Sequence, residues 1–309
     1  MKNFRPKNNK SPRNAPKGNF RKDDARKDRP RNNDRPKKDD VKAELPKKEF
    51  KRFNRDDHDN SAQRLTGPVL YGFHAVRAAI LNPARRVLRI LGTDEALDEF
   101  RATMDAAKEA DLKRPNVETI DKVKLDRMLP TGAVHQGIAA TVETLATRDA
   151  SDLVGDLDRN EKAVFVILDQ VTDPHNIGAI LRSAAAFGAK GVIMQDRHTP
   201  DMTGVVAKVA SGAVDVVPIA LETNLSRCIE MLQDNDFFVI GLDERGDDIG
   251  DLPDYDRVAL VLGAEGDGIR RLVAEHCDKL VSLPTQGQIL SLNVSNAAAV
   301  ALYATRHKN

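Results

Sequence analysis

The apolar run Ala163-Val164-Phe165-Val166-Ile167-Leu168 constrains the fold of this chain more than any other segment. It is short, rich in β-branched side chains and followed by polar residues, which favours a strand over a helix. A strand that is apolar at every position buries both of its faces, as strands inside parallel sheets do. The run therefore predicts a sheet that is covered by helices on both sides.

Strand-like and helical patterns alternate along the rest of the C-terminal half. Alternation of this kind predicts an open, mostly parallel α/β sheet, and ligands of such sheets bind at the carboxyl ends of the strands. Further strands are expected at 191–194, 214–219, 237–242, 258–262 and 279–283. Helices are expected at 177–187, 202–210, 225–234, 269–276 and 294–306.

A smaller α/β unit is predicted over residues 65–143. Its helical patterns lie at 74–81, where Asn82-Pro83 ends the pattern, at 95–110 and, capped by Asp121, up to 129. Its strands are expected at 87–91, 117–120 and 137–142. The polar, acidic segment 144–162 is expected to be a linker to the sheet domain at 163–309.

The first 64 residues differ from the rest of the chain in charge and in apolar content. They carry 22 Lys and Arg against 11 Asp and Glu, a net charge of +11, whereas the other residues carry 26 basic and 36 acidic groups, a net charge of −10. Val41 and Leu45 are their only large aliphatic residues after Met1, so residues 1–64 cannot bury enough apolar surface to offset chain entropy and are predicted to be disordered. The charge favours an arm that contacts RNA phosphates, and a merely solubilising tail is the alternative.

Composition argues against several classes of protein. No stretch approaches 18 uncharged apolar residues, so no membrane span is expected. The N-terminus has neither the apolar core of a signal peptide nor the acid-poor composition of a transit peptide. Cys228 and Cys277 are too few for a disulfide framework or a four-thiolate metal site. We expect a cytoplasmic protein in which both cysteines fill the core.

The first of three polar segments, 169–182, follows the apolar strand and opens a helix. Asn176 and Arg182 are predicted to flank a phosphate or a ribose, to which Arg offers a planar fork of donors. Gly178 lacks a Cβ atom, so a ligand backbone is expected to approach it. The alternatives are a capping Asn and a surface Arg, and His175 is expected to be a bystander or a cap.

The second segment, 262–269, contains Gly263, Gly266 and Gly268. Their spacing differs from the dinucleotide-binding fingerprint, and no Gly-Lys-Ser/Thr follows as in a phosphate-binding loop. Glu265 would repel a polyphosphate and suits a hydroxyl or a cationic ligand better. A tight turn that needs left-handed backbone is the alternative to a ligand site.

The third segment, 283–299, leads from a strand through Gly287 into an Ala-rich helix. Ser291, Asn293 and Ser295 are residue types that favour helix N-termini. Simple helix capping is therefore one interpretation of this segment, and a polar binding site is the other.

Together the three segments resemble the motifs of the SpoU/TrmH family of S-adenosylmethionine-dependent RNA ribose 2′-O-methyltransferases, within the SPOUT superfamily. The motifs read Asn176-x-Gly178-x-x-x-Arg182, Gly263-x-Glu265-Gly266-x-Gly268 and Ser291-Leu292-Asn293-Val294-Ser295-x-Ala297. The small unit resembles the substrate-binding domain of the ribosomal-RNA branch in Tyr71-Gly72-x-His74-Ala75-Val76 and His135-Gln136-Gly137. Two positions depart from the family pattern, with Thr285 for a usual Met and Leu290 for a common Glu.

The resemblance implies a fold that composition does not show. The C-terminal chain is expected to pass through a loop and form a deep trefoil knot, an exception to the rule that chains do not thread loops. The resemblance also implies a homodimer and an S-adenosylmethionine site built largely from backbone atoms. The residues expected to line that site by matched position are Gly263, Gly268, Ile269, Leu283 and Leu292.

The resemblance further implies the chemistry. The sulfonium of the cofactor already activates the methyl group, so no metal is expected, and the difficult part is to align a ribose 2′-hydroxyl with that methyl. Arg182 is the leading candidate for activating the hydroxyl. Because Arg stays protonated, stabilising the developing alkoxide or holding a phosphate is less demanding than removing a proton. The full set of candidate catalytic residues is Asn176, Arg182, Glu265, Ser291 and Asn293.

The implied substrate is RNA, since DNA lacks the 2′-hydroxyl. The small N-terminal unit favours a guanosine of large-subunit ribosomal RNA, and a tRNA ribose 2′-O-methyltransferase is the alternative within the family. A non-catalytic RNA-binding factor for ribosome assembly is disfavoured because every candidate catalytic position is filled. A nucleotide-dependent oxidoreductase is disfavoured by the missing dinucleotide fingerprint.

Overall fold

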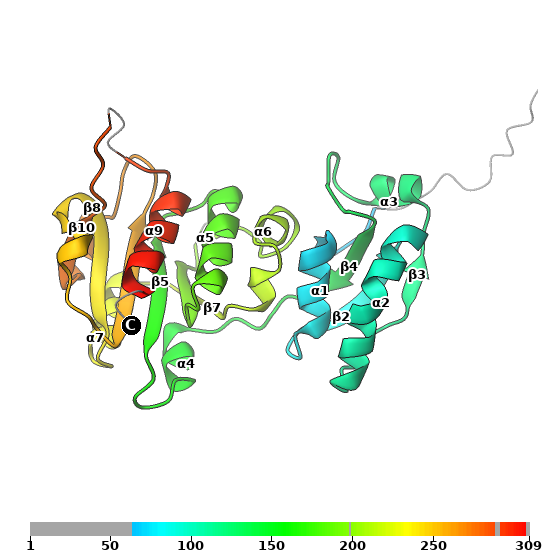
Figure 1. Cartoon of the computed structure of the whole chain (residues 1–309), viewed down its shortest axis with the longest axis horizontal. Helices are drawn as coiled ribbons and strands as arrows, with labels where there is room; N and C mark the ends of the chain where they lie inside the picture. The colour runs from blue at the N-terminus through cyan, green and yellow to red at the C-terminus, as the bar shows by residue number, and fades with distance from the viewer. Residues whose placement is uncertain (1–63, 198, 288–290, 307–309) are drawn as a thin grey trace, which may run out of the picture. The chain divides into compact units, whose positions relative to one another are not determined.

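The structure is a computed structural model that describes residues 64–197, 199–287 and 291–306. The described residues fall within one compact unit and build a four-stranded and a six-stranded sheet. We call residues 64–143, around the smaller sheet, the small module and residues 148–306, around the larger sheet, the large module (Figure 1). The predicted disordered arm lies outside the described residues, except for Arg64.

The small module orders its strands β1-β4-β2-β3, with β4 antiparallel to β1 and β2, and β3 parallel to β2. The side chains of Thr93 and Asp121 cap its second and third helices, as these residue types commonly do. Its elements are β1 (Val69–Tyr71), α1 (Phe73–Leu81), β2 (Val87–Gly92), α2 (Asp94–Glu109), β3 (Val117–Thr119), α3 (Lys122–Met128) and β4 (Ile138–Val142).

The large module orders its strands β10-β8-β9-β5-β6-β7, and every neighbouring pair is parallel. This confirms the predicted parallel α/β sheet, whose carboxyl strand ends all meet at one edge. The strands are β5 (Ala163–Asp169), β6 (Gly191–Gln195), β7 (Ile219–Glu222), β8 (Phe238–Asp248), β9 (Arg257–Gly263) and β10 (Lys279–Ser282).

The apolar run forms β5, which lies between β9 and β6 and is buried along its whole length. Successive side chains of a strand point to opposite faces of the sheet, so β5 contributes to both flanking cores. Val164, Val166 and Leu168 pack in one core, and Phe165 and Ile167 pack in the other. The run lacks polar residues because neither face of this strand meets solvent.

Helices cover both faces of the large sheet. On one face α5 (Pro174–Ala186) and α9 (Val294–Arg306) lie side by side, and α5 also packs against α6 (Gly204–Val209) (Figure 1). The helices that contribute to the core of the other face are α4 (Ala150–Gly155), α7 (Leu225–Gln233) and α8 (Arg271–His276).

The segment 144–162, predicted to be a linker, contains α4 as an integral part of the large module. Asp149 and Asp152 form a capping box at the start of α4. The buried Ala150 donates its N–H to Glu222 Oε1 at 2.8 Å, which attaches α4 to the end of β7. A helix this short and polar gives little periodic signal, which is why the sequence did not indicate it.

The predicted strand at 214–219 is wrong over most of its length. The chain instead forms a 3-10 turn, η1 (Ala213–Asp215), and β7 begins only at Ile219. Gly212 precedes the turn with a φ of 94°, a left-handed backbone that interrupts an extended path. Pro218 has no N–H group to donate to a strand ladder. The apolar residues between Gly212 and Pro218 therefore reach the core from a turn and not from a strand.

Gly178 allows two helices to pack closely and does not face a ligand, so that expectation is wrong. A Cβ atom at Gly178 would lie 2.7 Å from Val209 Cβ and 2.9 Å from the carbonyl oxygen of Val206, both on α6. The missing side chain therefore sets the close approach of α5 and α6.

Replacing Gly178 by Ala is expected to destabilise the chain by about 1–3 kcal/mol, because the added methyl group overpacks the contact with α6. Gly155→Ala is the matched control, since a Cβ atom there meets nothing within 4 Å, and it is expected to change stability by less than about 1 kcal/mol. Urea unfolding followed by circular dichroism measures both variants. Equal stabilities of the two variants would contradict the packing role of Gly178.

Candidate functional site

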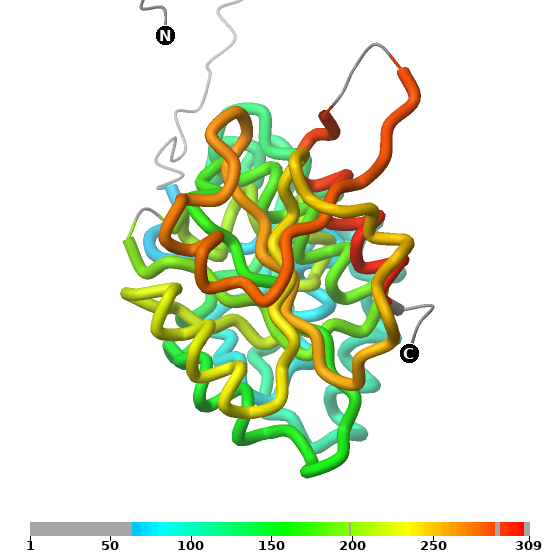
Figure 2. Tube along the Cα trace, turned by 90° about the vertical axis from the view of Figure 1, so that its left-hand side faces the viewer, coloured from blue at the N-terminus to red at the C-terminus, as the bar shows by residue number. Residues whose placement is uncertain are grey.

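The three polar segments lie at the carboxyl edge of the large sheet, as predicted. The first follows β5 and opens α5, the second follows β9, and the third joins β10 to α9. Figure 2 shows that the chain after β9 and the chain after β10, coloured orange to red, leave the sheet at the same end. Residues that are far apart in the sequence are thereby brought together.

One side chain from each segment meets in a hydrogen-bonded cluster. The Asn176 amide donates to Glu265 Oε1 at 3.1 Å. The Asn293 amide donates to Asn176 Oδ1 at 3.1 Å and also to the same oxygen of Glu265. We call Asn176, Glu265 and Asn293 the amide–carboxylate cluster, in which a single carboxylate oxygen accepts two amide donors.

Local helix caps fix the two asparagines of the cluster. Asp173 caps α5 by accepting the N–H of His175 at 2.9 Å, which sets Asn176 in the first turn. Asn293 Oδ1 accepts the N–H of Ser295 at 2.9 Å and its hydroxyl at 2.5 Å. Asn293 thus caps α9, as the first interpretation of the third segment expected, while its amide reaches the cluster. The side chain of His175 is exposed.

The glycines of the second segment are required by the turn itself. Ala264 and Gly268 exchange backbone hydrogen bonds of 3.2 and 3.0 Å, and a Cβ atom on Gly263 would lie 2.0 Å from the carbonyl carbon of Gly268. Gly266 and Gly268 have φ values of 86° and 68°, which residues with a side chain disfavour. The tight turn is therefore confirmed, and it carries Glu265 to the cluster.

An ion pair that the sequence did not indicate anchors this turn to β5. Asp169 is fully buried at the end of β5 and accepts the backbone N–H of Arg270 at 2.8 Å and its Nε at 2.7 Å. The contact ties the end of the second segment to the start of the first. The available signal was a carboxylate directly after an apolar strand, but no local pattern connects residues 101 positions apart.

Arg182 does not join the amide–carboxylate cluster. It lies six residues after Asn176 on α5, which is about 9 Å further along the helix axis and about 120° around it. Its side chain is exposed, and no partner of that side chain is found within the described ranges. Ser291 is also exposed, in the segment just before α9. Both groups are open to a substrate.

The residues predicted to line a cofactor site differ in burial. Ile269 is buried, Leu283 is half-buried against the core, and Leu292 keeps 43% of its surface exposed. Leu292 follows exposed Ser291 and precedes Asn293, so this segment presents apolar and polar surface side by side. That combination suits a ligand with a flat apolar ring and polar substituents.

A cavity of about 340 Å³ lies at the same edge, beside β5, β6 and the glycine turn. Its volume falls within the range of about 300–1,000 Å³ that is usual for small-molecule sites. Its lining combines apolar side chains with amides and with both signs of charge, and includes Leu168, Met194, Gln170, Arg197 and Asp267.

Metal sites, membrane spans and thiols bear on the whole described part of the chain and not on this edge alone. No three His, Cys, Asp or Glu side chains in the described part of the chain gather so as to hold a metal ion. None of the helices in that part is long and apolar enough to span a membrane. Cys228 is buried and Cys277 is partly buried, and burial raises the pKa of each thiol to about 12.

Comparison with known proteins identifies the family. A relative from Yersinia pestis named 23S rRNA (guanosine-2'-O-)-methyltransferase RlmB is 37% identical over 240 residues, which are 76% of this chain and 95% of the relative. A model of the SpoU rRNA Methylase family matches residues 163–303. The chain belongs to the SpoU rRNA methylase family. A second model, for RNA 2'-O ribose methyltransferase substrate binding, matches residues 69–147.

Further relatives of this SpoU family member agree with the match. The Escherichia coli protein of the same name is 37% identical over 242 residues, which are 76% of this chain and 96% of the relative. The crystal structure of the SpoU methyltransferase AviRb from Streptomyces viridochromogenes, in complex with AdoMet, is 23% identical and superposes with a TM-score of 0.63. That comparison covers 77% of this chain and 89% of AviRb, and it shows that the two share a fold.

The two thiols of this SpoU family member are expected to react only after unfolding. Burial raises the pKa of Cys228 and Cys277 from 9.0 to about 12, so both remain protonated at neutral pH, and the thiolate is the reactive form. We expect Ellman's reagent to titrate neither cysteine in the native protein and both in denaturant.

The same pKa shifts predict a pH dependence of stability. A thiol pKa that is higher in the folded state than in the unfolded state stabilises the fold below pH 9.0, and this contribution is lost as the pH rises toward about 12. Rapid reaction of either cysteine in the folded protein would contradict both predictions.

Proposed function

We propose that this chain transfers a methyl group from S-adenosylmethionine to the ribose 2′-hydroxyl of a guanosine in 23S ribosomal RNA, in the cytoplasm. The amide–carboxylate cluster is the observation that carries the proposal, because it unites one residue from each family motif at the ligand-binding edge. The relatives named for this reaction match this chain across both modules and over almost their entire length. That match favours ribosomal RNA over a tRNA substrate.

The residues at the edge fit S-adenosylmethionine chemically. Glu265 places a carboxylate where a cationic sulfonium is favoured and a polyphosphate is not. Leu283 and Leu292, which are partly exposed, offer apolar surface for an adenine ring, and the turn at Gly263–Gly268 offers backbone atoms at the same edge. Ile269 is buried in a core cluster and supports this turn from within. When bound, the cofactor supplies an electrophilic methyl group, so the chain has only to bind and align the nucleophile.

Counting donors and acceptors shows which members of the cluster are fully used by contacts within the protein and which can still bind substrate. An Asn amide has two N–H donors and one oxygen acceptor. Both donors of Asn293 are used, on Asn176 and Glu265, and its oxygen is occupied by Ser295. Asn293 therefore holds the site together. Asn176 retains one N–H, and Glu265 retains its second oxygen, for the ribose hydroxyls.

Arg182 supplies positive charge at the edge of the site. Its guanidinium stays protonated, so it acts by stabilising the developing alkoxide or by holding the phosphate beside the target ribose, and not by accepting the proton. Its offset from Asn176 along α5 leaves it outside the cluster, which suits a contact with the phosphate beside the target ribose. Ser291, which is exposed in the third segment, fixes the ribose or the loop in this proposal.

A trefoil knot is the topology that we propose for the C-terminal chain. β10 pairs first with residues 240–241 of β8 and then, after a jump in register, with residues 247–248. The intervening part of β8 approaches β10 so closely that a Cβ atom on Gly246 would lie 2.5 Å from the backbone of Val281. This close approach of two paired strands, followed by the return of α9 onto α5, supports the knot.

A homodimer through α9 is the assembly that we propose. Val300 and Tyr303 keep 45% and 52% of their surface exposed on this helix, while its small residue Ala298 is fully buried against the module. Residues three positions apart lie on one face of a helix, and neighbouring exposed apolar side chains of this kind mark interaction surfaces.

Methyl transfer from radiolabelled S-adenosylmethionine to ribosomal RNA, with mass-spectrometric mapping of the product, tests the proposed function directly. We expect one 2′-O-methylguanosine in 23S ribosomal RNA. Folded protein that binds the donor but methylates neither ribosomal RNA nor tRNA would refute the proposal.

Replacing Arg182 by Ala is expected to lower the rate of methyl transfer by about 10²–10³-fold, the loss seen when a preorganised electrostatic contact to a transition state is removed. The affinity for S-adenosylmethionine, measured by calorimetry, is expected to stay unchanged because Arg182 lies outside the proposed cofactor site. Arg77→Ala, which removes an exposed arginine from α1 of the small module, is the control. Wild-type turnover by Arg182→Ala would exclude the assigned role.

Deleting residues 1–60 is expected to weaken RNA binding at low salt, because the first 64 residues carry a net charge of +11 that releases counterions from phosphates. The slope of the logarithm of the binding constant against the logarithm of salt concentration measures this effect. Thermal unfolding is expected to be unchanged by the deletion. Identical slopes with and without the segment would show that it makes no net phosphate contacts.

A further inference from the structure

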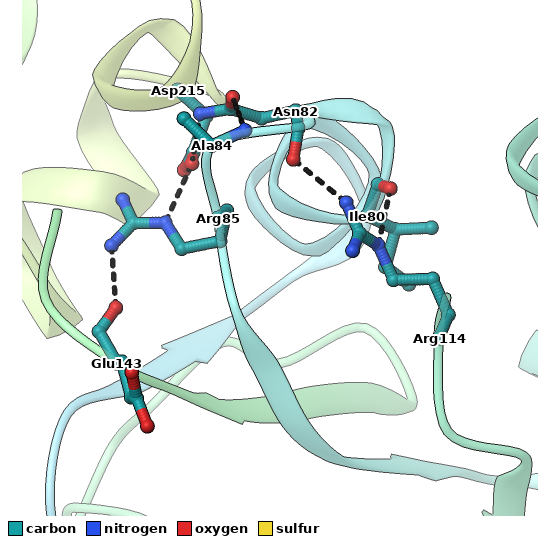
Figure 3. Close-up of polar contacts among 7 residues, drawn as sticks. All are labelled: Ile80, Asn82, Ala84, Arg85, Arg114, Glu143 and Asp215. Carbon is teal, nitrogen blue, oxygen red and sulfur yellow. Dashed lines mark hydrogen bonds and ion pairs between the residues drawn. The ribbon is translucent and has the colours of Figure 1, made fainter. Parts of the chain in front are cut away.

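A buried ion pair joins the two modules. Arg85, just after α1, donates from Nε to Asp215 Oδ1 in η1 at 2.7 Å, and the two side chains are 2% and 1% exposed (Figure 3). Every other ion pair among the described residues has at least one partner that is 40% exposed or more. This pair is therefore the exception in its burial, and it connects residues 130 positions apart.

Further hydrogen bonds hold the residues around this ion pair (Figure 3). Asn82 also donates to Asp215 Oδ1, at 3.0 Å, and its own side-chain oxygen accepts the N–H of Ala84 at 2.9 Å. Arg114 donates to the carbonyl oxygens of Asn82 and Ile80, both at 2.7 Å. These hydrogen bonds stabilise the conformation of the turn after α1 in which Asn82 and Arg85 both contact Asp215.

The same arginine holds the exit from the small module. Arg85 Nη1 donates to the carbonyl oxygen of Glu143 at 2.9 Å, directly after β4. Only residues 144–147 then separate this point from Arg148, which forms a β-bridge with Ala220 of the large module. Arg85 therefore contacts the large module and the connecting chain at the same time.

Further contacts between the modules involve the two motifs of the small unit, the one around His74 and the one around Gln136. A Cβ atom on Gly212 would lie 2.7 Å from Ala78 Cβ and 2.7 Å from the carbonyl oxygen of His74. At the N-terminus of α1, Gln136 Oε1 accepts hydrogen bonds from Lys208 Nζ at 2.5 Å and from the N–H of Phe73 at 3.3 Å. The motif around His74 and the motif around Gln136 thus face α6 and η1, and they serve docking between modules.

We propose that Arg85 and Asp215 are positioning residues, which fix the small module on α6 and η1 so that RNA bound by the small module presents its target ribose to the amide–carboxylate cluster. This rests on the proposed function. A buried ion pair costs desolvation that well-packed apolar residues would not, so its use is in directional geometry and not in stability. In agreement, Arg85 Nη2 is buried without a partner among the described residues.

The position of the modules is tested by pulsed electron paramagnetic resonance between nitroxide labels on Val123→Cys in the small module and Leu272→Cys in the large module. Both sites are more than half exposed, and the two natural cysteines are expected to stay unlabelled because of their burial. Labelled chains are mixed with an excess of unlabelled chains, so that the proposed dimer carries one labelled copy, and we then expect one narrow distance distribution in the parent protein. Asp215→Ala is expected to broaden it, and Asp215→Asn, which keeps the size of the side chain, serves if the Ala variant does not fold.

Glu118→Ala is the matched control, because it removes a carboxylate that pairs with an arginine, Arg89, on the exposed surface of the small module. It is expected to leave the distance distribution unchanged. A distribution as narrow as that of the parent protein in the folded Asp215 variants would overturn the proposal. This measurement needs no catalysis, so its result is independent of the proposed function.

Single-turnover methyl transfer within a preformed complex with RNA and donor supplies the second readout. Misplacement of a substrate by about 1 Å costs on the order of 10²-fold in rate, so the Asp215 variants are expected to lose up to this factor. Their affinity and stoichiometry for S-adenosylmethionine are expected to match those of Glu118→Ala. A single-turnover rate equal to the control in folded Asp215 variants would overturn the positioning role, whereas no transfer by the parent protein would refute the proposed function instead.

Discussion

Burial of β5 on both faces is the constraint on which the rest of the structure depends. A strand with no polar face needs a core on each side, and β5 obtains them from α5 and α9 on one face and from the helices of the second core on the other. Its neighbours β9 and β6 are parallel to it, so their carboxyl ends open at the same edge. Motifs more than 100 residues apart in the sequence meet there for this reason.

Within that edge, Glu265 organises the polar groups. One of its oxygens accepts an amide hydrogen from Asn176 and another from Asn293, and hydrogen bonds in such a network strengthen one another. The carboxylate therefore sets the orientation of both asparagines, while the glycine turn and the Asp169–Arg270 pair fix the carboxylate itself. Each member of the cluster is thereby held by a different segment of the chain.

The sequence predicted those features that local chemistry determines. The apolar run, the end of α1 before Asn82, the cap at Asp121 and the left-handed turn at Gly266 all follow from residue types over a few positions. Contacts across the chain were beyond such reasoning: Asp169 with Arg270, and Arg85 with Asp215, are ordinary polar residues until the fold brings them together. The role of Gly178 could not be predicted for the same reason, because α6, which packs against it, lies elsewhere in the sequence.

The buried carboxylates of Asp169 and Asp215 have a different role from the apolar cores. Apolar contacts are non-directional, and one core cluster runs through α1 of the small module and α5 and α6 of the large module, so it holds the modules together without fixing their orientation. Asp169 orients the glycine turn through its contact with Arg270, and Asp215 orients the small module through its contact with Arg85. Since α5 carries Asn176 and Arg182 and also packs on α6 and η1, the site and the small module are both positioned against a single helix.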